Sequence, residues 1–401
     1  MNKQKKIMLL GGIHYLLPAI KTAHAHGYYV ITADYLPDNV AHKYSDEYVN
    51  VSIVDKEAVL KVAQEKQIDG IISFGVDPGV VAAAYVQEKM GLPSMGPYAS
   101  VEILQNKDKF RAFLQEHGFN CPKSKGYSSI EEALADTDWL TWPMIVKPTD
   151  SAGSKGVTRV DRIEDYKAAV EEAFVKSIKG NIVVEQFIEQ DGYQSGSDSF
   201  SVDGKMVFTT FDDQHFDKSA TNPYTPSAHT WPSTMPREAQ DYLRCEIQRL
   251  VSLLGMKTTM YNIEARVGKD GKPYIMELSP RAGGNCLAEL LVHATDVDMI
   301  TAQVCAAVGD DFQIEDKPFK GYWADIILHA PKSGRFEGIE IVDSYKKNVV
   351  EVRLWKKVGD KVDGFDNASN SIGVLFARFD DREEIDNAIA NQDKWIKIEV
   401  E

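Results

Sequence analysis

The strongest constraint on the fold is an alternation of short apolar strands with helices in the N-terminal part of the chain. The predicted strands and helices there are residues 6–10, 15–26, 28–34, 58–67, 70–75 and 80–90. Strands that alternate with helices at such spacing form a parallel sheet with helices on both faces. Ligands usually bind at the carboxyl ends of these strands. We therefore predict an N-terminal α/β domain with a parallel sheet over residues 1–105.

The pattern changes near residue 106. Predicted helices are residues 107–117, 162–177 and 237–255, and predicted strands are residues 142–148, 181–188, 258–267 and 272–280. A hairpin over residues 197–213 turns at Asp203-Gly204, and residues 215–236, rich in Pro, Ser and Thr, are predicted to form a long loop. These elements predict a central α+β domain over residues 106–315, with a small lid subdomain at about residues 120–188.

The last part of the chain is mostly strand-like. Predicted strands are residues 322–330, 348–355 and 371–379, and a closing helix covers residues 382–392. Short strands of this kind, with little helix between them, predict a small β-rich C-terminal domain over residues 316–401.

The composition excludes some partners. The 401 residues carry a formal net charge of -15, and such a surface repels nucleic acid and anionic membranes. The four cysteines lie far apart without metal-ligand spacing, which predicts reduced thiols and a cytoplasmic protein. The apolar run at residues 7–20 is broken by Gly11, Gly12 and His14, so we interpret it as a strand rather than a signal peptide. No run approaches the roughly 20 apolar residues of a membrane span.

Two acidic residues carry the most functional information. Glu264 in YNIEARV and Glu277 in YIMELSPR lie on predicted strands that a four-residue turn joins. The hairpin should set both carboxylates side by side within apolar runs, where they repel each other unless a cation lies between them. Magnesium accepts one or two carboxylates together with substrate phosphates, so the pattern predicts a Mg²⁺ site.

Three nearby motifs could bind phosphate or nucleotide. Lys147 ends an apolar strand and either meets an anion or reaches solvent. The loop at residues 149–157 contains small residues whose backbone N–H groups can approach phosphate. The strand end Glu185-Gln186-Phe187-Ile188 could offer backbone groups to an adenine edge or be an ordinary terminus.

Arg281 supplies a fixed positive fork for a phosphate or an oxyanion, or else forms a structural salt bridge with one of the two acids. The turn Gly283-Gly284-Asn285 opens a predicted helix, whose N-terminus can bind an anion. His229 in the long loop is either a substrate contact or a solvated histidine.

Taken in this order, the motifs resemble the ATP-grasp superfamily, the branch that contains biotin carboxylase, carbamoyl-phosphate synthetase and the L-amino acid ligases. The resemblance implies a pre-ATP-grasp domain, an ATP-grasp domain of two α+β subdomains and a small β-rich tail. It implies ATP and Mg²⁺, with Mn²⁺ as a substitute, as cofactors. The implied ATP-binding residues are Lys109, Lys147, Ser151, Gly153, Ser154, Lys155, Gly156, Glu185, Gln186, Phe187, Ile188 and, for the ribose, Gln194.

The resemblance also implies roles in catalysis. Glu264, Glu277 and Ser279, which stands where many members have asparagine, would bind the metal, and Arg281 and Lys147 would be catalytic. The implied substrate contacts are Arg281, Gly283, Gly284 and His229. Dimerisation is common in this branch, which makes a homodimer a possible assembly.

The implied reaction joins a small carboxylate to an amine through an acyl phosphate, with amino acids as candidate substrates. One alternative is a purine-pathway enzyme that carboxylates or formylates a ribonucleotide. Such a substrate needs basic residues in the N-terminal loops, where His14 is the obvious one. Another alternative, of a different class, is a regulatory nucleotide-binding protein without turnover. The presence of Lys147, Glu264, Glu277 and Arg281 argues against it.

Overall fold

A parallel sheet forms the N-terminal part of the protein, as predicted. The computed structural model describes residues 4–149, 156–220, 222 and 225–401. Its first sheet has the order β3-β2-β1-β4, and all its pairings are parallel. The strands are β1 (Lys6–Leu10), β2 (Tyr29–Asp34), β3 (Glu47–Asn50) and β4 (Gly70–Ile72). The helices of this region are α1 (Leu17–Ala25), α2 (Lys56–Lys66), α3 (Val80–Met90) and α4 (Tyr98–Gln105). Short 3-10 turns at His14–Leu16, Val40–Lys43 and Asp77–Gly79 lie beyond strand ends.

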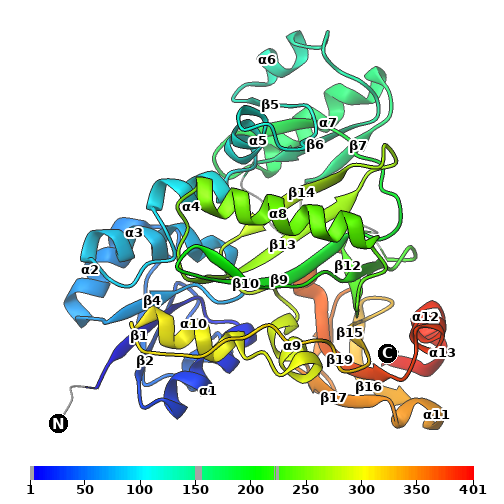
Figure 1. Ribbon diagram of the computed structural model, residues 1–401. Helices are drawn as coiled ribbons and strands as arrows, with labels where there is room; N and C mark the ends of the chain where they lie inside the picture. The colour runs from blue at the N-terminus through cyan, green and yellow to red at the C-terminus, as the bar shows by residue number, and fades with distance from the viewer. Residues whose placement is uncertain (1–3, 150–155, 221, 223–224) are drawn as a thin grey trace.

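A second sheet, antiparallel and of order β5-β8-β6-β7, forms the lid subdomain. Its strands are β5 (Ser124–Tyr127), β6 (Met144–Pro148), β7 (Thr158–Val160) and β8 (Ile182–Gln186). The helices around it are α5 (Lys107–Glu116), α6 (Ile130–Ala135) and α7 (Ile163–Lys176). Figure 1 shows this sheet at the top of the view, apart from the blue N-terminal sheet. The lid has its own small apolar core, which includes Val146, Tyr166 and Val184.

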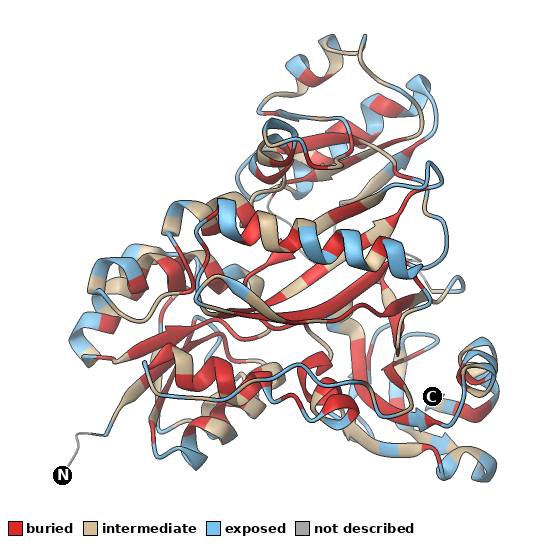
Figure 2. Cartoon of the chain, viewed as in Figure 1, coloured by how far each residue is buried: buried red, intermediate tan, exposed pale blue. Residues whose placement is uncertain are grey.

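The third sheet, of order β10-β9-β13-β14, lies at the centre of the molecule (Figure 1). Its strands are β9 (Ser195–Val202), β10 (Lys205–Thr209), β13 (Thr259–Val267) and β14 (Pro273–Ser279). Helix α8 (Arg237–Leu253) buries Leu243, Ile247 and Leu250 in a core shared with these strands, while its polar face is exposed (Figure 2). Burial of each such side chain contributes about 1.5–3 kcal/mol. Helices α9 (Leu287–Thr295) and α10 (Met299–Ala307) follow in the chain.

Two further sheets form the C-terminal region, which is strand-rich as predicted. One has the order β11-β12-β15-β19-β17 and the other β18-β16-β20. The strands are β11 (Asp213–Phe216), β12 (Pro226–Trp231), β15 (Tyr322–His329), β16 (Gly334–Ile341), β17 (Val349–Leu354), β18 (Lys361–Val362), β19 (Ser371–Phe379) and β20 (Ile396–Val400). The helices are α11 (Asp343–Lys346), α12 (Arg382–Ala390) and α13 (Gln392–Trp395), with a 3-10 turn at Ala368–Asn370.

The prediction of a long loop over residues 215–236 is wrong. The end of β11 and all of β12 lie within this stretch, at residues 215–216 and 226–231, and β12 pairs with β15 almost 100 residues later in the chain. The Pro, Ser and Thr residues of this stretch give no clear strand signal in the sequence. Strand β12 is instead stabilised by pairing with a strand that is distant in the chain. This sheet therefore combines strands from before and after residue 316, where a domain boundary was predicted. The domain limits stay predictions. The sequence analysis also missed strands β3, β5, β7, β16, β18 and β20 and helices α4, α6, α10 and α11.

Candidate active site

Strands β13 and β14 place two acids side by side. Glu264 and Glu277 are direct partners in the antiparallel register, so their side chains share one face of the central sheet. The turn between the strands contains Gly271 at a φ of 76°, a conformation that glycine adopts without strain. Burial raises the pKa of Glu264, and the neighbouring Glu277 carboxylate raises it further. Two neighbouring carboxylates of this kind are stabilised when a cation binds between them. We call Glu264 and Glu277 the acid pair.

Two lysines bring positive charge to the acid pair. The Nζ atom of Lys107, in the first turn of α5, lies 3.7 Å from Oε2 of Glu277. Lys107 and Lys147 both favour the ionised form of Glu264 and so counteract the rise in its pKa. Lys107 is 22% exposed and Glu277 35% exposed, so both can reach a ligand from the same side. The lysines and the acids together form a site that suits a metal–polyphosphate complex.

The structure does not bring Lys109 to this group. Lys109 is exposed and lines a shallow cavity with Asp108 and Gly126. Lys107 shares its helical face with Arg111 and Leu114, which are both buried, since residues four and seven apart lie on one side of a helix. This helical spacing is the feature of the sequence that could have identified Lys107, rather than Lys109, as the lysine near the acid pair.

Glu185 in β8 lies at the centre of a buried ion-pair network. Its Oε2 accepts a hydrogen bond of 2.8 Å from Nε of Arg111, and its Oε1 accepts one from Nζ of Lys147. Burial opposes ionisation of this carboxyl group, but Arg111 and Lys147 outweigh it and lower its pKa to about 2. Nη1 of Arg111 also donates to the Met276 carbonyl, at 2.8 Å. The network therefore ties the strand predicted to hold adenine to the strand that carries Glu277.

The other residues of the predicted adenine strand have defined backbone partners. The Gln186 amide donates to the Lys123 carbonyl at 2.8 Å, and the Phe187 amide donates to the Pro143 carbonyl at 3.0 Å. The Ile188 carbonyl accepts a 3.5 Å contact from Nη1 of Arg266.

Gln194, predicted to meet the ribose, has both ends of its side-chain amide engaged. Its Nε2 donates to Oε1 of Gln214 at 2.7 Å, and its Oε1 accepts from Nη2 of Arg266. Arg266 was not predicted from the sequence, although it lies two residues after Glu264 and therefore on the same face of β13. A ribose contact by Gln194 would require these partners to change.

Four predicted phosphate contacts, Ser151, Gly153, Ser154 and Lys155, lie outside the described residues. Gly156 is described and has a φ of 70°. A Cβ atom there would lie 2.9 Å from Cβ of Lys176 and 3.1 Å from Cγ of Pro148. Both the backbone conformation and the close packing therefore require glycine at this position.

Arg281 is held by an acid of the N-terminal domain. Its Nε and Nη2 donate to the two carboxylate oxygens of Asp77 at 2.7 and 2.6 Å, and the Ser279 hydroxyl donates to Oδ1 of Asp77 at 2.9 Å. Burial opposes ionisation of Asp77, but Arg281 outweighs it and lowers the pKa. The sequence analysis considered a salt bridge between Arg281 and one member of the acid pair. In the structure the salt-bridge partner of Arg281 is Asp77. The sequence signal for Asp77 was its place just after a strand of the parallel sheet.

The turn at residues 283–286, which we call the substrate turn, is held in place by hydrogen bonds with Asp198 and Tyr15. The Gly283 amide donates to both carboxylate oxygens of Asp198, at 2.9 and 3.0 Å, and burial raises the pKa of Asp198 to about 6. A Cβ on Gly284 would lie 3.5 Å from the ring of Tyr15, whose hydroxyl donates to Oδ1 of Asn285 at 2.8 Å. The sequence did not single out Asp198 or Tyr15.

His229 is not a loop residue, which corrects the sequence prediction. It lies in β12, is buried, and its Nδ1 is 2.5 Å from Oδ2 of Asp212. Burial disfavours the imidazolium form, but Asp212 outweighs it and raises the pKa of His229. A solvated loop histidine is therefore excluded.

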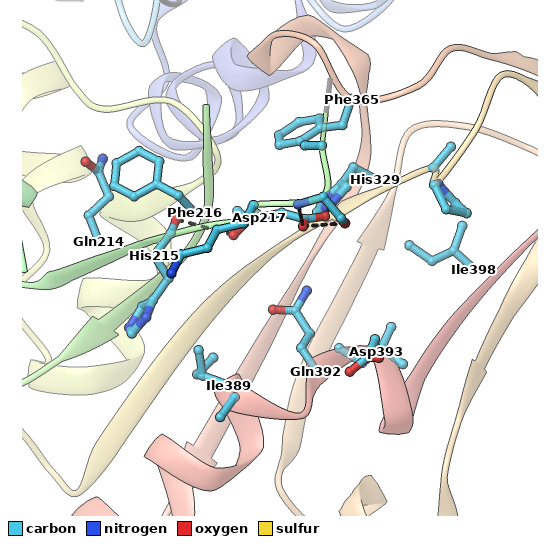
Figure 3. A pocket seen from close by; sticks show the side chains of 18 of the residues that line it. Gln214, His215, Phe216, Asp217, His329, Phe365, Ile389, Gln392, Asp393 and Ile398 are labelled. Carbon is cyan, nitrogen blue, oxygen red and sulfur yellow. Dashed lines mark hydrogen bonds and ion pairs between the residues drawn. The ribbon is translucent and has the colours of Figure 1, made fainter. Parts of the chain in front are cut away.

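A cavity of about 1080 Å³ lies elsewhere, between β11 and the C-terminal elements α12, α13 and β20. Figure 3 shows Asp217, His329 and Phe365 grouped in it; the His329 ring stacks on Phe365 with ring centres 4.1 Å apart. None of the predicted site residues lines this cavity, so the chemistry described above does not depend on it.

Over the part of the chain that the structure describes, no cluster of three or more His, Cys, Asp or Glu side chains could hold a metal ion. The acid pair alone is what Mg²⁺ needs when phosphate oxygens and water complete its coordination. Within the same described residues no helix is both long enough and apolar enough to cross a membrane.

Two domain families match the chain. The ATP-grasp domain matches residues 140–289, which include Lys147, Glu185 and the acid pair. Residues 140–289 are thus similar to the ATP-grasp domain. The L-amino acid ligase C-terminal domain 2 matches residues 326–401. ATP-grasp enzymes generally use ATP with magnesium.

The similar proteins agree with this assignment. The carbamoyl phosphate synthase large chain of Thermotoga petrophila is 26% identical over 295 residues, which are 70% of this chain but 26% of that protein. The chain thus spans about a quarter of the length of the curated relatives it matches.

Solved structures show the same fold. An L-amino acid ligase from Bacillus licheniformis superposes with a TM-score of 0.82 at 22% identity, over 100% of both chains. The biotin carboxylase domain of 2-oxoglutarate carboxylase from Hydrogenobacter thermophilus has a TM-score of 0.75 at 16% identity, over 100% of this chain and 92% of that one. That structure is a complex with MgADP and bicarbonate.

Proposed function

We propose that this protein is an ATP- and magnesium-dependent ligase that activates a small carboxylate as an acyl phosphate and joins it to an amine. The observation that carries the proposal is the acid pair, in direct cross-strand register, with Lys107 beside Glu277. Both acids lie within residues 140–289, which match the ATP-grasp domain. The matched L-amino acid ligase domain supports amino acids as substrates.

The residues present fit magnesium and a polyphosphate. Glu264 and Glu277 supply hard carboxylate oxygens, and Ser279 follows on the same strand. A bound Mg²⁺ would neutralise charge on the phosphates during in-line transfer. Lys107, in place of Lys109, and Lys147 would hold phosphate oxygens. Glu185 would act by orienting Lys147, since its carboxylate is already engaged.

The substrate residues lie next to this group. Arg281, oriented by Asp77, would steady the developing negative charge as the carboxylate attacks the phosphate. The substrate turn and His229, held by Asp212, would bind the substrate. The carboxylate oxygen forms a bond to the γ-phosphorus as ADP leaves, and the amine then displaces phosphate from the acyl carbon. No protein nucleophile takes part.

The purine-pathway alternative fits less well. A ribonucleotide phosphate needs cations at the carboxyl ends of the parallel strands. The connections after β1, β2, β3 and β4, at residues 11–16, 35–46, 51–55 and 73–79, contain one Lys and no Arg; the lysine is Lys43, at the end of the 3-10 turn Val40–Lys43. His14 is stacked on Trp355, with ring centres 3.9 Å apart, and burial lowers its pKa to about 4. These connections therefore offer few of the basic residues expected for that substrate.

The test is phosphate release from ATP with Mg²⁺ and mixtures of carboxylates and amines. We expect turnover only when both a carboxylate and an amine, or hydroxylamine as a general acceptor, are present. Mass spectrometry should then detect the amide or hydroxamate. Phosphate release that is independent of the carboxylate would refute the ligase. Absence of phosphate release with every pair would refute the ligase and favour the regulatory alternative.

A further inference from the structure

Asp325 in β15 is a buried carboxyl group without a partner. Its exposed fraction is 0%, and among the described residues neither of its carboxyl oxygens has a hydrogen-bond partner. Buried polar groups in folded proteins are almost always paired, because leaving one unpaired costs about 1–3 kcal/mol. The unpaired state of Asp325 therefore requires an explanation, and the reaction described above does not use this residue.

The charged groups around Asp325 come from three elements and one loop residue. His229 of β12, Glu289 of α9 and Arg353 of β17 interact with it electrostatically, and so does Asp212, which precedes β11. Both cations already have other acid partners. His229 bonds Asp212, and Arg353 donates to Glu289 and to both carboxylate oxygens of Glu351. The neighbourhood thus holds more acids than cations, and burial raises the pKa of Asp325 to about 8.

Asp325 also lies beside the substrate residues. It is the direct register partner of His229, so the two side chains share one face of their sheet. Its charge affects Tyr15, which bonds Asn285, and Cys286, both at the substrate turn. The sequence places no signal on Asp325, since it is one acid inside an apolar strand, YWADIILH.

We propose that Asp325 anchors the ammonium group of the substrate whose carboxylate is phosphorylated, so that the acyl donor is an amino acid rather than a simple carboxylic acid. This inference rests on the proposed ligase function. An ammonium group brings three N–H donors and one positive charge, which are the two things that the surroundings of Asp325 lack. The donor is the substrate concerned because its carboxylate must reach the phosphate beside Arg281, next to the substrate turn.

Binding of such a donor should release a proton. Without a ligand, Asp325 is largely protonated at neutral pH, since its pKa lies near 8. An ammonium group stabilises the carboxylate form, so the carboxyl proton leaves to solvent as the donor binds. At pH 7 the release should be close to one proton per bound donor.

The first experiment compares matched donors with hydroxylamine as the acceptor, so that amine specificity plays no part. L-alanine is compared with propanoate and L-phenylalanine with phenylpropanoate, by hydroxamate formation with ATP and Mg²⁺. We expect the wild type to prefer the amino acid, and Asp325→Asn to lose kcat/KM for it by a factor on the order of 100. The kcat/KM for the simple acid should change little.

Asp213→Asn is the matched control. Asp213 is also buried, but its carboxylate accepts hydrogen bonds from the Ser233 hydroxyl and the Thr234 amide. This variant should keep the preference for amino acids. Thermal unfolding of both variants checks that they fold, and Asp325→Leu provides a second replacement with an apolar side chain.

The second experiment measures proton release. The faster amino acid donor is titrated calorimetrically into the wild type and into Asp325→Asn, in two buffers of different ionisation enthalpy at pH 7. Proton release in the wild type that disappears in Asp325→Asn supports the inference, and a purely structural role of Asp325 would not produce it. Equal use of simple acids, or an unchanged preference and proton count in the variant, overturns the inference while the ligase function stands. Absence of turnover with every donor overturns both.

Discussion

Replacing Glu277 by Gln should separate catalysis from stability. The side chain keeps its size but loses the charge that makes the acid pair a metal site. Removal of a single well-placed electrostatic group from an active site typically costs about 3–4 kcal/mol of transition-state stabilisation. We therefore expect phosphate release in the presence of carboxylate and amine to fall by a factor on the order of 10³.

The same change should not weaken the unliganded fold. Cross-strand partners have their Cβ atoms about 5 Å apart, where two full charges at an effective dielectric of 20 repel by about 3 kcal/mol. By the same formula Lys107, at 3.7 Å from Glu277, attracts it by about 4 kcal/mol, so the two interactions nearly cancel, and Glu277 is 35% exposed, so screening weakens both. We therefore expect Glu277→Gln to change the unfolding free energy by about 1 kcal/mol or less.

The assay pairs initial rates of phosphate release with denaturant unfolding of the unliganded protein. Glu189→Gln is the control, since Glu189 forms an exposed ion pair with Lys269 at 2.7 Å. It should alter neither quantity. Turnover of Glu277→Gln within tenfold of the wild type, or a loss of more than about 2 kcal/mol of unfolding free energy, would show that Glu277 is a structural residue.

Three further predictions concern the nucleotide site. Lys107→Ala should raise the KM for ATP by a factor on the order of 10–100, and Lys109→Ala should leave it within about twofold; steady-state kinetics checks both, and the reverse order would restore Lys109 to the site. Glu185 has its pKa lowered to about 2, so it contributes stability above pH of about 4.3 that is lost as the pH falls towards 2. The difference in unfolding free energy between wild type and Glu185→Gln, about 3 kcal/mol at pH 7, should therefore shrink across that window, and a pH-independent difference would contradict the ion-pair network. Gly156→Ala should destabilise the protein by about 1–2 kcal/mol in thermal unfolding, because of its left-handed φ and the contact with Lys176; an unchanged melting temperature would show that the backbone can relax there.

Much of the fold followed from local pattern. The parallel N-terminal sheet and the strand-rich C-terminal region were predicted from apolar periodicity. In the lid, strands β6 and β8 were predicted in this way, but β5 and β7 were not. The stretch at residues 215–236 was not, because its strands are stabilised by partners far away in the chain. Strand pairing of this kind depends on the surface that the rest of the molecule offers, and a short polar strand carries little signal of its own.

The candidate site divides in the same way. Lys147 and the acid pair could be selected from the sequence, while Asp198 and Asp325 could not, and the signal for Asp77 was its place after a strand of the parallel sheet. Each of these three acids bonds to or pairs with a residue 85 or more positions away in the chain. Lys107 is an intermediate case: the sequence analysis named Lys109, although helical spacing places Lys107 on the same face as the buried Arg111.

The sequence by itself determined that Glu264 and Glu277 face each other, because a short turn between two strands fixes their register and therefore the face on which each side chain lies. Only the tertiary structure decided what surrounds them. Three sets of contacts join separate elements. They are the paired hydrogen bonds from Arg281 to Asp77, the Lys147–Glu185–Arg111 network and the pairing of Asp325 with His229. Such contacts depend on how whole sheets pack, and packing is a property of the folded chain that no local pattern contains.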